Sequence, residues 1–536
     1  MELINMTLGE LLEKQAELYP DQEALIFPDK NIRYTYKQYN KAVDDLAKGL
    51  MALGVKKGDH IAVWSQNVPY WIIYMFAVAK IGAVLLTVNT AYRSKDLEYV
   101  LKQSDTTGLA MTRGVGHGQS FNNFLETIDE LIPELKIQKP GELKSVKFPK
   151  LKSLMFMGDE EIPGFYNIQQ IIELGKKNIS NAEFINRCKD VKPDEVVNMQ
   201  YTSGTTGFPK GVMLTHLNIL NNGFWIGEKM KYTNKDRLCL TVPLFHCFGC
   251  VLGVMAVTTH GATIILMETF NPHRALEIVQ SEKCTSIYGV PTMFIGELNL
   301  PSFSTFDLSS LRTGIMAGSL CPVSVMKDVI EKMNCCELTI VYGLTESSPG
   351  ITQSSTEDSS EIRATTVGKV LPGIEVKIIN PTTLEELGDN QEGELCCRGY
   401  NVMKGYYNKP EEDSKVFLPG GWLRSGDLAI RDSNGYFRIT GRFKDIIIRG
   451  GENISPKEIE DFIYQIEGVK DVQVVAVPSK KYGEEICAFI ILKENYTLSE
   501  NDIKNFCRNK IARFKIPKYI IFTNSFPLTA SGKIQK

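Results

Sequence analysis

Between residues 35 and 112 the chain alternates two hydrophobic patterns. Apolar positions at helical spacing are followed by short, continuous apolar runs that are typical of buried strands. The predicted helices and strands are, in chain order, residues 36–53, 60–64, 70–80, 83–88, 95–103 and 108–111. Strands that alternate with helices in this way indicate a parallel sheet covered by helices. We therefore predict an α/β fold for this part of the chain.

The same alternation returns after a less regular stretch. Residues 114–191 are more charged and less periodic, and they predict no definite element. Beyond Asp194 the expected strands and helices are residues 196–199, 216–228, 237–242, 250–259, 262–266 and 272–282. The repetition predicts two α/β subdomains of similar architecture. Because open parallel sheets bind ligands at the carboxyl ends of their strands, chemistry is expected in the loops that follow strands.

Beyond Val367 the pattern changes to short alternating strands. Asn434-Gly435 lies between apolar runs at 428–431 and 437–440, which is a strong hairpin signal. We predict a small β-barrel-like subdomain there.

The last segment predicts a compact α+β domain. Its strands and helices are expected at residues 446–448, 472–477, 486–492, 500–511 and 519–522, with a further helix that opens at Ser455, Pro456 and Glu458. Those three residues have the spacing of a capping box. With a hinge just before it, the chain divides into a large N-terminal domain, residues 1–441, and a small mobile C-terminal domain, residues 442–536.

Composition narrows the class of protein. The 536 residues are too many for one hydrophobic core, and 43% hydrophobic with 23% charged residues is ordinary for a globular protein. A net charge of −3 gives no reason to expect nucleic-acid binding. The longest apolar stretch, residues 71–88, is interrupted by Lys80 and Gly82, so we expect no transmembrane segment. Peripheral membrane contact and the oligomeric state, including a homodimer, stay open.

Targeting and redox signals point to a cytoplasmic protein. The N-terminus lacks a basic region followed by an apolar run, so a secretory signal is not expected. The twelve cysteines lie in apolar surroundings and not at framework spacings. We interpret them, including Cys247 and Cys250, as reduced core residues.

One loop carries the strongest chemical signal. Residues 201–211 hold five hydroxyl side chains, three glycines and Lys210, between two apolar runs. Glycine lets successive backbone N–H groups converge, and hydroxyls and an ammonium add further donors, which suits a polyphosphate. The spacing differs from the Walker loop, so this is a phosphate site of another kind.

Two further turns follow predicted strands. His246 lies directly after the strand at 237–242. Tyr342-Gly343-Leu344-Thr345-Glu346 follows an apolar run at 338–341. There an aromatic face can stack a purine, a threonine can bind a phosphate, and a carboxylate can ligate Mg²⁺.

Together these motifs resemble the adenylate-forming, or AMP-binding, superfamily of acyl-CoA synthetases, adenylation domains and luciferases. The resemblance spans roughly residues 10–536 and is closest to medium-chain fatty acyl-CoA synthetases, on account of residues 447–454 and 514–519. It implies that a carboxylic acid reacts with ATP to give an acyl-adenylate and pyrophosphate. The thiol of coenzyme A then displaces AMP.

The resemblance also implies roles for individual residues. The implied catalytic residues are Lys533, His246, Thr345 and Glu346, with Glu346 and Thr205 on Mg²⁺. The implied nucleotide-binding residues are Thr202, Ser203, Gly204, Thr205, Thr206, Gly207, Lys210, Gly318, Tyr342, Gly343, Asp427 and Arg442. Arg449, Gly450 and Gly451 are assigned to CoA, Lys444 to the hinge, and Trp225, Phe248, Ala317 and Gly350 to the acyl pocket.

Three alternatives stay open against a fatty acid–CoA ligase. One is a stand-alone adenylation domain that loads a carrier protein, and another is a ligase for aryl or alicyclic acids. A nucleotide-binding protein without catalysis is disfavoured, because Glu346, Asp427, Arg442 and Lys533 are all present. The expected acid is of medium to long chain. Its exact length is not fixed by the sequence, although the small residues Ala317, Gly318, Gly343 and Gly350 are expected to leave room for an extended acid.

Overall fold

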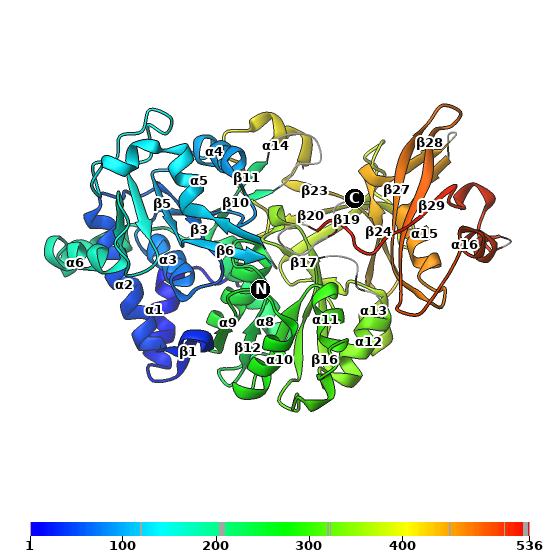
Figure 1. Ribbon diagram of the computed structural model, residues 1–536, viewed down its shortest axis with the longest axis horizontal. Helices are drawn as coiled ribbons and strands as arrows, with labels where there is room; N and C mark the ends of the chain where they lie inside the picture. Colours follow the sequence, from blue (N-terminus) through cyan, green and yellow to red (C-terminus); the bar gives the residue numbers. More distant parts are fainter. Residues whose placement is uncertain are drawn as a thin grey trace. The chain divides into compact units, whose positions relative to one another are not determined.

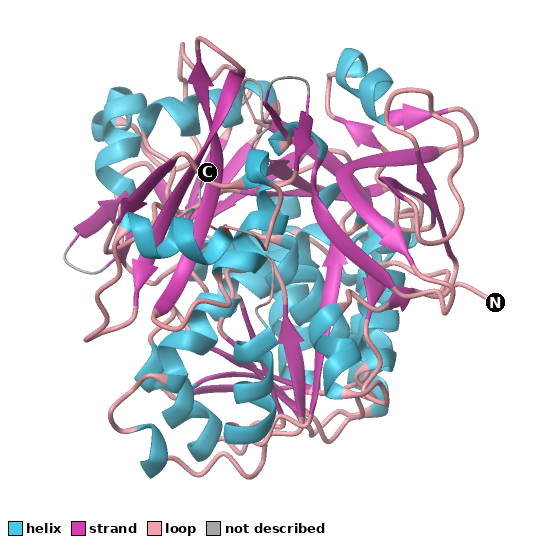
Figure 2. Ribbon diagram, turned by 90° about the vertical axis from the view of Figure 1, so that its right-hand side faces the viewer, coloured by secondary structure: helices cyan, strands magenta, loops and turns pink. Residues whose placement is uncertain are grey.

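The chain folds into two compact units. The computed structural model describes residues 2–117, 120–202, 209–318, 321, 323–449, 452–508, 510–528 and 534. Unit 1 comprises Met1–Ile374 and Arg398–Phe417, and unit 2 comprises Glu375–Cys397 and Leu418–Lys536. Helices surround the strands of unit 1 (Figures 1 and 2). The predicted domain boundary at residues 441 and 442 stays a prediction.

Unit 1 contains a nine-stranded sheet of order β18-β17-β16-β15-β14-β12-β13-β1-β2. Its strands are β1 Glu23–Phe27, β2 Ile32–Thr35, β12 Arg237–Leu240, β13 Thr263–Leu266, β14 Ser286–Gly289, β15 Thr313–Met316, β16 Glu337–Gly343, β17 Gly350–Gln353 and β18 Lys369–Val370. The run from β16 through β13 to β1 is parallel, so the carboxyl ends of these strands meet at one edge.

A second sheet of unit 1 has eight strands in the order β21-β11-β10-β4-β3-β5-β8-β9. The strands are β3 His60–Trp64, β4 Val84–Thr87, β5 Gly108–Met111, β8 Ser153–Phe156, β9 Phe165–Asn167, β10 Val196–Thr202, β11 Lys210–Thr215 and β21 Gly405–Tyr406. The last strand, β21, comes from far along the chain and pairs antiparallel with β11. A separate hairpin joins β6 Gly114–His117 and β7 Ser120–Asn123.

Helices cover both sheets. They are α1 Leu8–Leu18, α2 Tyr36–Ala52, α3 Pro69–Lys80, α4 Ser94–Gln103, α5 Phe124–Leu131, α6 Ile168–Asn178, α7 Asn181–Lys189, α8 His216–Lys229, α9 Ala256–Thr259, α10 Pro272–Ser281, α11 Pro291–Leu298, α12 Val323–Lys332, α13 Ser360–Thr365 and α14 Pro410–Val416. Two glycines let helices α2 and α6 pack against each other at short distance. A Cβ on Gly175 of α6 would lie 2.5 Å from the backbone nitrogen of Gly49 on α2. No helix of the described residues is long and apolar enough to cross a membrane.

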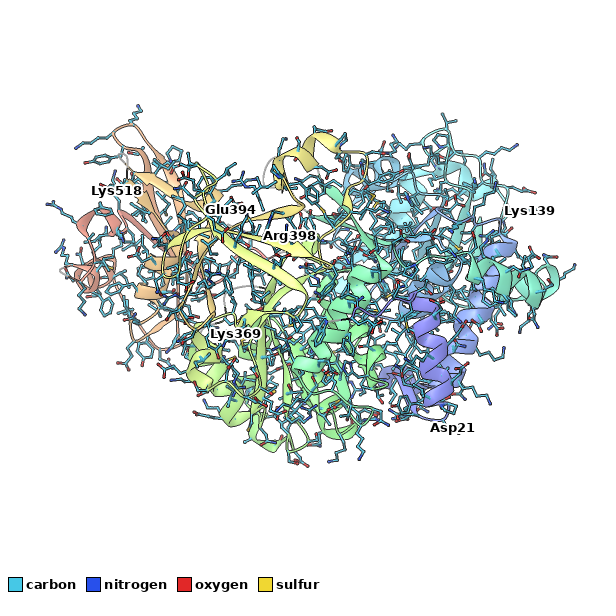
Figure 3. The ribbon with its side chains drawn as sticks, turned by 180° about the vertical axis from the view of Figure 1, so that it is seen from behind. Asp21, Lys139, Lys369, Glu394, Arg398 and Lys518 are labelled. Carbon is cyan, nitrogen blue, oxygen red and sulfur yellow. The ribbon has the colours of Figure 1, made fainter. Side chains whose placement is uncertain are left out.

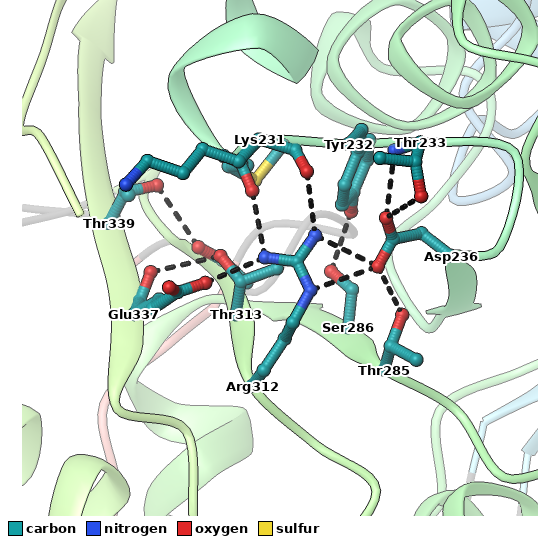
Figure 4. Close-up of polar contacts among 12 residues, drawn as sticks. Lys231, Tyr232, Thr233, Asp236, Thr285, Ser286, Arg312, Thr313, Glu337 and Thr339 are labelled. Atoms are coloured by element: carbon teal, nitrogen blue, oxygen red, sulfur yellow. Dashed lines mark hydrogen bonds and ion pairs between the residues drawn. The ribbon is translucent and has the colours of Figure 1, made fainter.

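The amino ends of the nine-stranded sheet are joined by one arginine (Figure 4). The guanidinium of Arg312, next to β15, donates to Asp236 Oδ1 at 2.9 and 3.0 Å and to Glu337 Oε2 at 2.6 Å. It also donates to the carbonyl oxygens of Met230 and Lys231, at 2.9 and 3.0 Å, just beyond the end of α8. This network holds the edge opposite to the carboxyl ends.

Unit 2 contains two further sheets. The first has the order β19-β20-β23-β22, with β24 beside β23, and occupies the segment where a barrel-like subdomain is predicted. The second has the order β26-β25-β28-β27, with β29 beside β28. The strands are β19 Ile374–Ile379, β20 Glu392–Gly399, β22 Phe417–Leu418, β23 Trp422–Arg431, β24 Phe437–Arg442, β25 Ile447–Arg449, β26 Glu452–Ile454, β27 Val469–Ser479, β28 Gly483–Leu492 and β29 Tyr519–Phe522; the helices are α15 Pro456–Ile463 and α16 Glu500–Cys507.

Three sequence predictions need correction. The stretch 114–191 forms the hairpin β6–β7, strands β8 and β9 and helices α5, α6 and α7. Residues 250–259 are not one α-helix: a π-helix, Phe248–Met255, precedes the short α9. The capping box at Ser455 is wrong, because its hydroxyl donates to the carbonyl of Thr440 while Glu458 pairs with Lys515.

Candidate active site

Several of the predicted site residues of unit 1 lie at the carboxyl edge of the nine-stranded sheet. His246 follows β12, Ala317 and Gly318 follow β15, and Thr345 and Glu346 follow β16. These strands belong to one parallel run, so the loops emerge on the same side. Gly318 has φ +90°, a conformation that favours glycine.

His246 and Thr345 are connected through a thiol. The backbone N–H of Phe248 donates to His246 Nδ1 at 3.1 Å, so Nδ1 is an acceptor and a neutral ring carries its proton on Nε2. Cys247 Sγ lies 3.6 Å from His246 Nδ1 and 3.8 Å from Thr345 Oγ1. The structure therefore brings together two side chains that are 99 positions apart in the sequence. The π-helix Phe248–Met255 begins directly after Cys247. Such π-helical segments are common near functional sites.

Glu346 is held by the segment that carries β21. Its carbonyl accepts a hydrogen bond from the Met403 N–H at 2.9 Å. Its carboxylate oxygen Oε1 accepts one from the Tyr406 hydroxyl at 2.8 Å. Burial raises the pKa of the Tyr406 hydroxyl and the nearby Glu346 carboxylate raises it further, so the phenol stays protonated and donates. This contact links the two sheets of unit 1.

Lys210 opens β11, where it pairs in register with Thr202 of β10. Its Nζ lies 3.0 Å from Glu412 Oε2 and 4.5 Å from the centroid of the Tyr406 ring. Hydrogen bonds from Lys415 and Lys210 lower the pKa of Glu412 to about 2. The other predicted phosphate-loop residues lie outside the described residues: Ser203, Gly204, Thr205, Thr206 and Gly207.

In unit 2, Asp427 and Arg442 are cross-strand partners on β23 and β24. Arg442 Nε donates to Asp427 Oδ1 at 3.1 Å, and the nucleotide-binding role of the two residues stays a prediction. The Asp427 side chain is 11% exposed and that of Arg442 61%. Glu394 on β20 (Figure 3) supports the irregular part of β23 before Asp427, because its Oε1 accepts from the Gly426 N–H at 3.0 Å.

Arg449 is already engaged within unit 2. Its guanidinium hydrogen-bonds the nearly buried Glu485 carboxylate and lies 4.5 Å from the centroid of the Tyr482 ring. Burial alone would raise the pKa of Glu485, but the hydrogen bond from Arg449 reverses this and the pKa is lowered. The CoA role of Arg449 stays a prediction. Gly450, Gly451 and Lys533 lie outside the described residues.

The hinge residue Lys444 lies in a 3-10 turn, Phe443–Asp445, between β24 and β25. Its side chain is exposed. The hinge role stays a prediction.

The structure corrects one expectation about the acyl pocket. A Cβ on Gly350 would lie 3.1 to 3.2 Å from Asn222, Leu371 and Ile226, and a Cβ on Gly343 would lie 1.8 Å from the carbonyl oxygen of Pro349. The space beside these glycines is filled by protein atoms, so both residues permit close packing and do not open room for an acid.

The other acyl-pocket assignments stay predictions. Phe248 is 6% exposed and its ring stacks on Tyr288 at 5.8 Å. Trp225 on α8 is half-buried and contacts Phe224 edge to face. Ala317, at the end of β15, is 5% exposed.

Two contacts of the site could not be found from local sequence patterns. Tyr406 is separated from Glu346 by 60 positions, and Glu412 from Lys210 by 202. The available signals were weak: a glycine before two tyrosines at 405–407, and an acidic first turn in α14. Neither pattern specifies a partner.

The donor set around Glu346 fits a metal ion that arrives with a nucleotide. The described residues contain no group of three or more His, Cys, Asp or Glu side chains placed to hold a metal. Glu346 offers one carboxylate at the site. Mg²⁺ is commonly bound by one or two carboxylates together with substrate phosphates and water, so one carboxylate suffices.

Comparison with known families covers almost the whole chain. The family described as AMP-binding enzyme matches residues 12–407. The family described as AMP-binding enzyme C-terminal domain matches residues 458–533.

Curated relatives and solved structures agree with these matches. The chain is 52% identical to the putative acyl-CoA synthetase YngI of Bacillus subtilis, over 100% of this chain and 96% of that protein. It is 42% identical to the mitochondrial medium-chain acyl-CoA ligase ACSF2 of Rattus norvegicus, over 100% and 87% of the two chains. A crystal structure of the anthranilate CoA ligase AuaEII with anthranoyl-AMP shares the fold with a TM-score of 0.85, at 24% identity and over 100% and 96% of the chains. These likenesses confirm the predicted fold class, a large N-terminal α/β domain with a small C-terminal domain.

Proposed function

Because this chain belongs to the AMP-binding enzyme family and is an ATP-dependent, AMP-forming acyl-CoA synthetase, we propose that its acid substrate is a medium-chain fatty acid. The observation that carries this proposal is the 42% identity to a medium-chain acyl-CoA ligase along the full length of the chain. ATP and CoA are substrates. The free thiols of all twelve cysteines support a reducing compartment such as the cytoplasm.

The proposed reaction has two steps. A carboxylate oxygen of the acid attacks the α-phosphorus of ATP, and the bond to the pyrophosphate oxygen breaks. The CoA thiol, after losing its proton, attacks the acyl carbon, and the C–O bond to AMP breaks. Adenylation is needed because oxide is a very poor leaving group, whereas AMP is a good one.

The residues at the carboxyl edge are suited to the first step. The Thr345 hydroxyl is a donor for the α-phosphate, and the His246 ring, oriented by the Phe248 N–H, can donate from Nε2 to an oxygen of the reacting groups. Lys210 supplies positive charge for the terminal phosphates. Glu346, with Thr205, would hold Mg²⁺, which when bound offsets the phosphate charge.

The remaining assignments follow the family. Asp427 accepts hydrogen bonds from the ribose hydroxyls, and Arg442, paired with Asp427, contacts the same sugar. Lys533 bridges the attacking carboxylate and the α-phosphate. Lys444 is the hinge, Arg449 with Gly450 and Gly451 contacts CoA, and Trp225, Phe248 and Ala317 line the acyl pocket.

A panel of acids tests the proposed substrate class. CoA-dependent AMP release is measured with straight-chain acids from acetate to palmitate, with benzoate and with cyclohexanecarboxylate. We expect kcat/KM to peak at a medium-chain acid. A maximum at benzoate or at the alicyclic acid would assign the enzyme to the aryl or alicyclic ligases. AMP release that requires a carrier protein in place of CoA would contradict the proposal.

A further inference from the structure

Residues 403–407 are hydrogen-bonded to β11 of the eight-stranded sheet and to Glu346, in the turn that follows β16 of the nine-stranded sheet. The N–H of Tyr407 donates to the Gly211 carbonyl at 2.8 Å, and that of Lys404 to the Met213 carbonyl at 2.9 Å. The N–H of Tyr406 donates to Asp413 Oδ1 at 2.8 Å, which joins these residues to α14. The backbone around Tyr406 is therefore fixed by β11, through Lys404 and Tyr407, and by Asp413, through the N–H of Tyr406 itself.

The side chain of Tyr406 contacts two charged groups that come from different sheets. The residue is only 4% exposed. Its hydroxyl donates to Glu346 Oε1 at 2.8 Å, while Lys210 Nζ lies 4.5 Å from the centroid of its ring. One phenol therefore fixes a carboxylate by its edge and an ammonium by its face. A tyrosine that served packing alone would need neither contact.

Glu412 forms ion pairs with two lysines, Lys210 and Lys415. Its Oε2 lies 3.0 Å from Lys210 Nζ, and its other oxygen lies 2.5 Å from Lys415 Nζ. The Lys210 and Glu412 side chains are 19% and 25% exposed, so a ligand can approach the pair. If Lys210 moves to another anion, Glu412 keeps Lys415 as a cationic partner. Breaking the Lys210–Glu412 pair therefore costs less free energy than breaking an isolated buried ion pair.

We propose that Tyr406 is a positioning residue that orients Glu346 and Lys210 toward one magnesium–triphosphate ligand, and that Glu412 is a counter-ion which the phosphates displace from Lys210. This inference rests on the proposed function, since it takes the ligand to be a nucleoside triphosphate or its pyrophosphate product. Tyr406 acts through the two charged residues and need not touch the ligand. Glu412 sets how tightly phosphate is held.

The Tyr406 part is tested by equilibrium binding of ATP with Mg²⁺ and of ATP in EDTA, measured by titration calorimetry. Tyr406→Phe keeps the ring below Lys210 and removes the hydroxyl from Glu346. We expect affinity for the magnesium complex to fall about tenfold, as for the loss of other supporting contacts to metal ligands, with unchanged affinity for metal-free ATP. Unchanged affinity for both forms, or an equal loss for both, would overturn the positioning role. Melting temperatures identify a variant that fails to fold.

The Glu412 part is tested with inorganic pyrophosphate in EDTA. Glu412→Gln keeps the shape of the side chain and removes its charge, so we expect pyrophosphate to bind several-fold more tightly. This gain in affinity should vanish in a Lys210→Met background, because the ammonium for which Glu412 and pyrophosphate compete is then absent. Glu411→Gln, which removes a neighbouring carboxylate of the same helix that pairs with Lys409, is the matched control and should bind like the wild type.

The outcomes distinguish a failure of the roles inferred for Tyr406 and Glu412 from a failure of the proposed function. Weaker pyrophosphate binding by Glu412→Gln, or the same gain without Lys210, would overturn the displacement by phosphate. Wild-type protein that binds neither ATP nor pyrophosphate would instead contradict the proposed function. Wild-type binding with no difference among the variants would overturn the inference alone.

Discussion

At the scale of single residues, Glu297 is a buried carboxyl group outside the site. It lies on α11 at 1% exposure, and its Oε2 has no hydrogen-bond partner among the described residues. Burial raises the pKa of this carboxyl well above the ordinary range of a glutamate. Folding therefore favours the protonated form of Glu297, whereas the unfolded chain releases the proton at the ordinary pKa of a glutamate.

This difference predicts a pH-dependent stability. Above pH 4.5 the unfolded state loses its proton while the folded state retains it, so the contribution of Glu297 is fully present below that pH and is lost as pH rises. The loss is about 1.4 kcal/mol per pH unit until the folded pKa is reached. Glu297→Gln removes this dependence. We expect its melting temperature relative to wild type to rise with pH above the pKa of the unfolded chain, by about 2 °C per unit.

The test is calorimetry of both proteins across this pH range, in which the contributions of unaltered groups cancel in the difference. Glu361→Gln, at an exposed position of α13, is the control for the loss of a surface carboxylate. A flat difference for Glu297→Gln would mean that Glu297 is ionised in the folded protein.

Residues that lie close together can be predicted from sequence where a local pattern, such as a hairpin, fixes both partners. Asp427 and Arg442 were expected to act together, and a hairpin places them opposite each other in register. Tyr406 and Glu412 escaped detection because their partners are set by the pairing of β21 with β11, which joins distant segments. The small residues at 343 and 350 misled because a missing side chain does not reveal whether neighbouring atoms fill the space.

At the scale of elements, sequence patterns worked best for strands that lie inside parallel sheets. β3 and β5 have the bounds that their apolar runs predict, because both faces of such strands are buried. β8 and β9 lie in the charged stretch 114–191, whose weak periodicity concealed them. The π-helix after His246 was read as part of an α-helix, since a continuous apolar run does not distinguish helical periods.

The amino edge of the nine-stranded sheet gives a prediction about an element boundary. Arg312 joins Asp236, Glu337 and the end of α8, and the Asp236 side chain is only 6% exposed. Arg312→Met leaves both carboxylates and two carbonyl oxygens without this donor. We expect a loss of about 3 kcal/mol in the stability of unit 1, because a partly buried charge loses its partner.

Calorimetry should show a lower melting temperature for Arg312→Met, with KM for ATP unchanged in the remaining folded enzyme. Arg312→Lys should recover only part of the loss, since an ammonium cannot reproduce the forked geometry of a guanidinium. A variant as stable as wild type would show that the network contributes little. A changed KM would show coupling to the carboxyl edge.

At the scale of the whole molecule, the two half-reactions make different demands on one acyl carbon. The carbon must first be held beside the α-phosphate and then be open to the CoA thiol. We propose that a rearrangement of the C-terminal domain about Lys444 meets both demands. The surrounding 3-10 turn, Phe443–Asp445, is a short, exposed connection of the kind that absorbs changes in backbone torsion.

Lys444→Pro tests the rearrangement. Proline fixes φ near −65°, which suits a 3-10 turn, and it also restricts the preceding Phe443. We expect pyrophosphate release to survive and acyl-CoA formation to fall, with both measured separately on folded protein. Lys444→Ala, which removes the side chain but leaves the backbone free, should support both half-reactions. Near-wild-type thioester formation by the proline variant would place the hinge elsewhere.

The central claim is that a carboxylate oxygen attacks the α-phosphorus of ATP. It is tested most directly with octanoate labelled with ¹⁸O in its carboxylate, together with ATP and CoA, followed by mass spectrometry of the nucleotide product. With both carboxylate oxygens labelled, the mechanism predicts AMP that carries one ¹⁸O atom from the acid, octanoyl-CoA that keeps the other ¹⁸O in its carbonyl group, and unlabelled pyrophosphate. Unlabelled AMP, or formation of ADP with labelled inorganic phosphate, would contradict it.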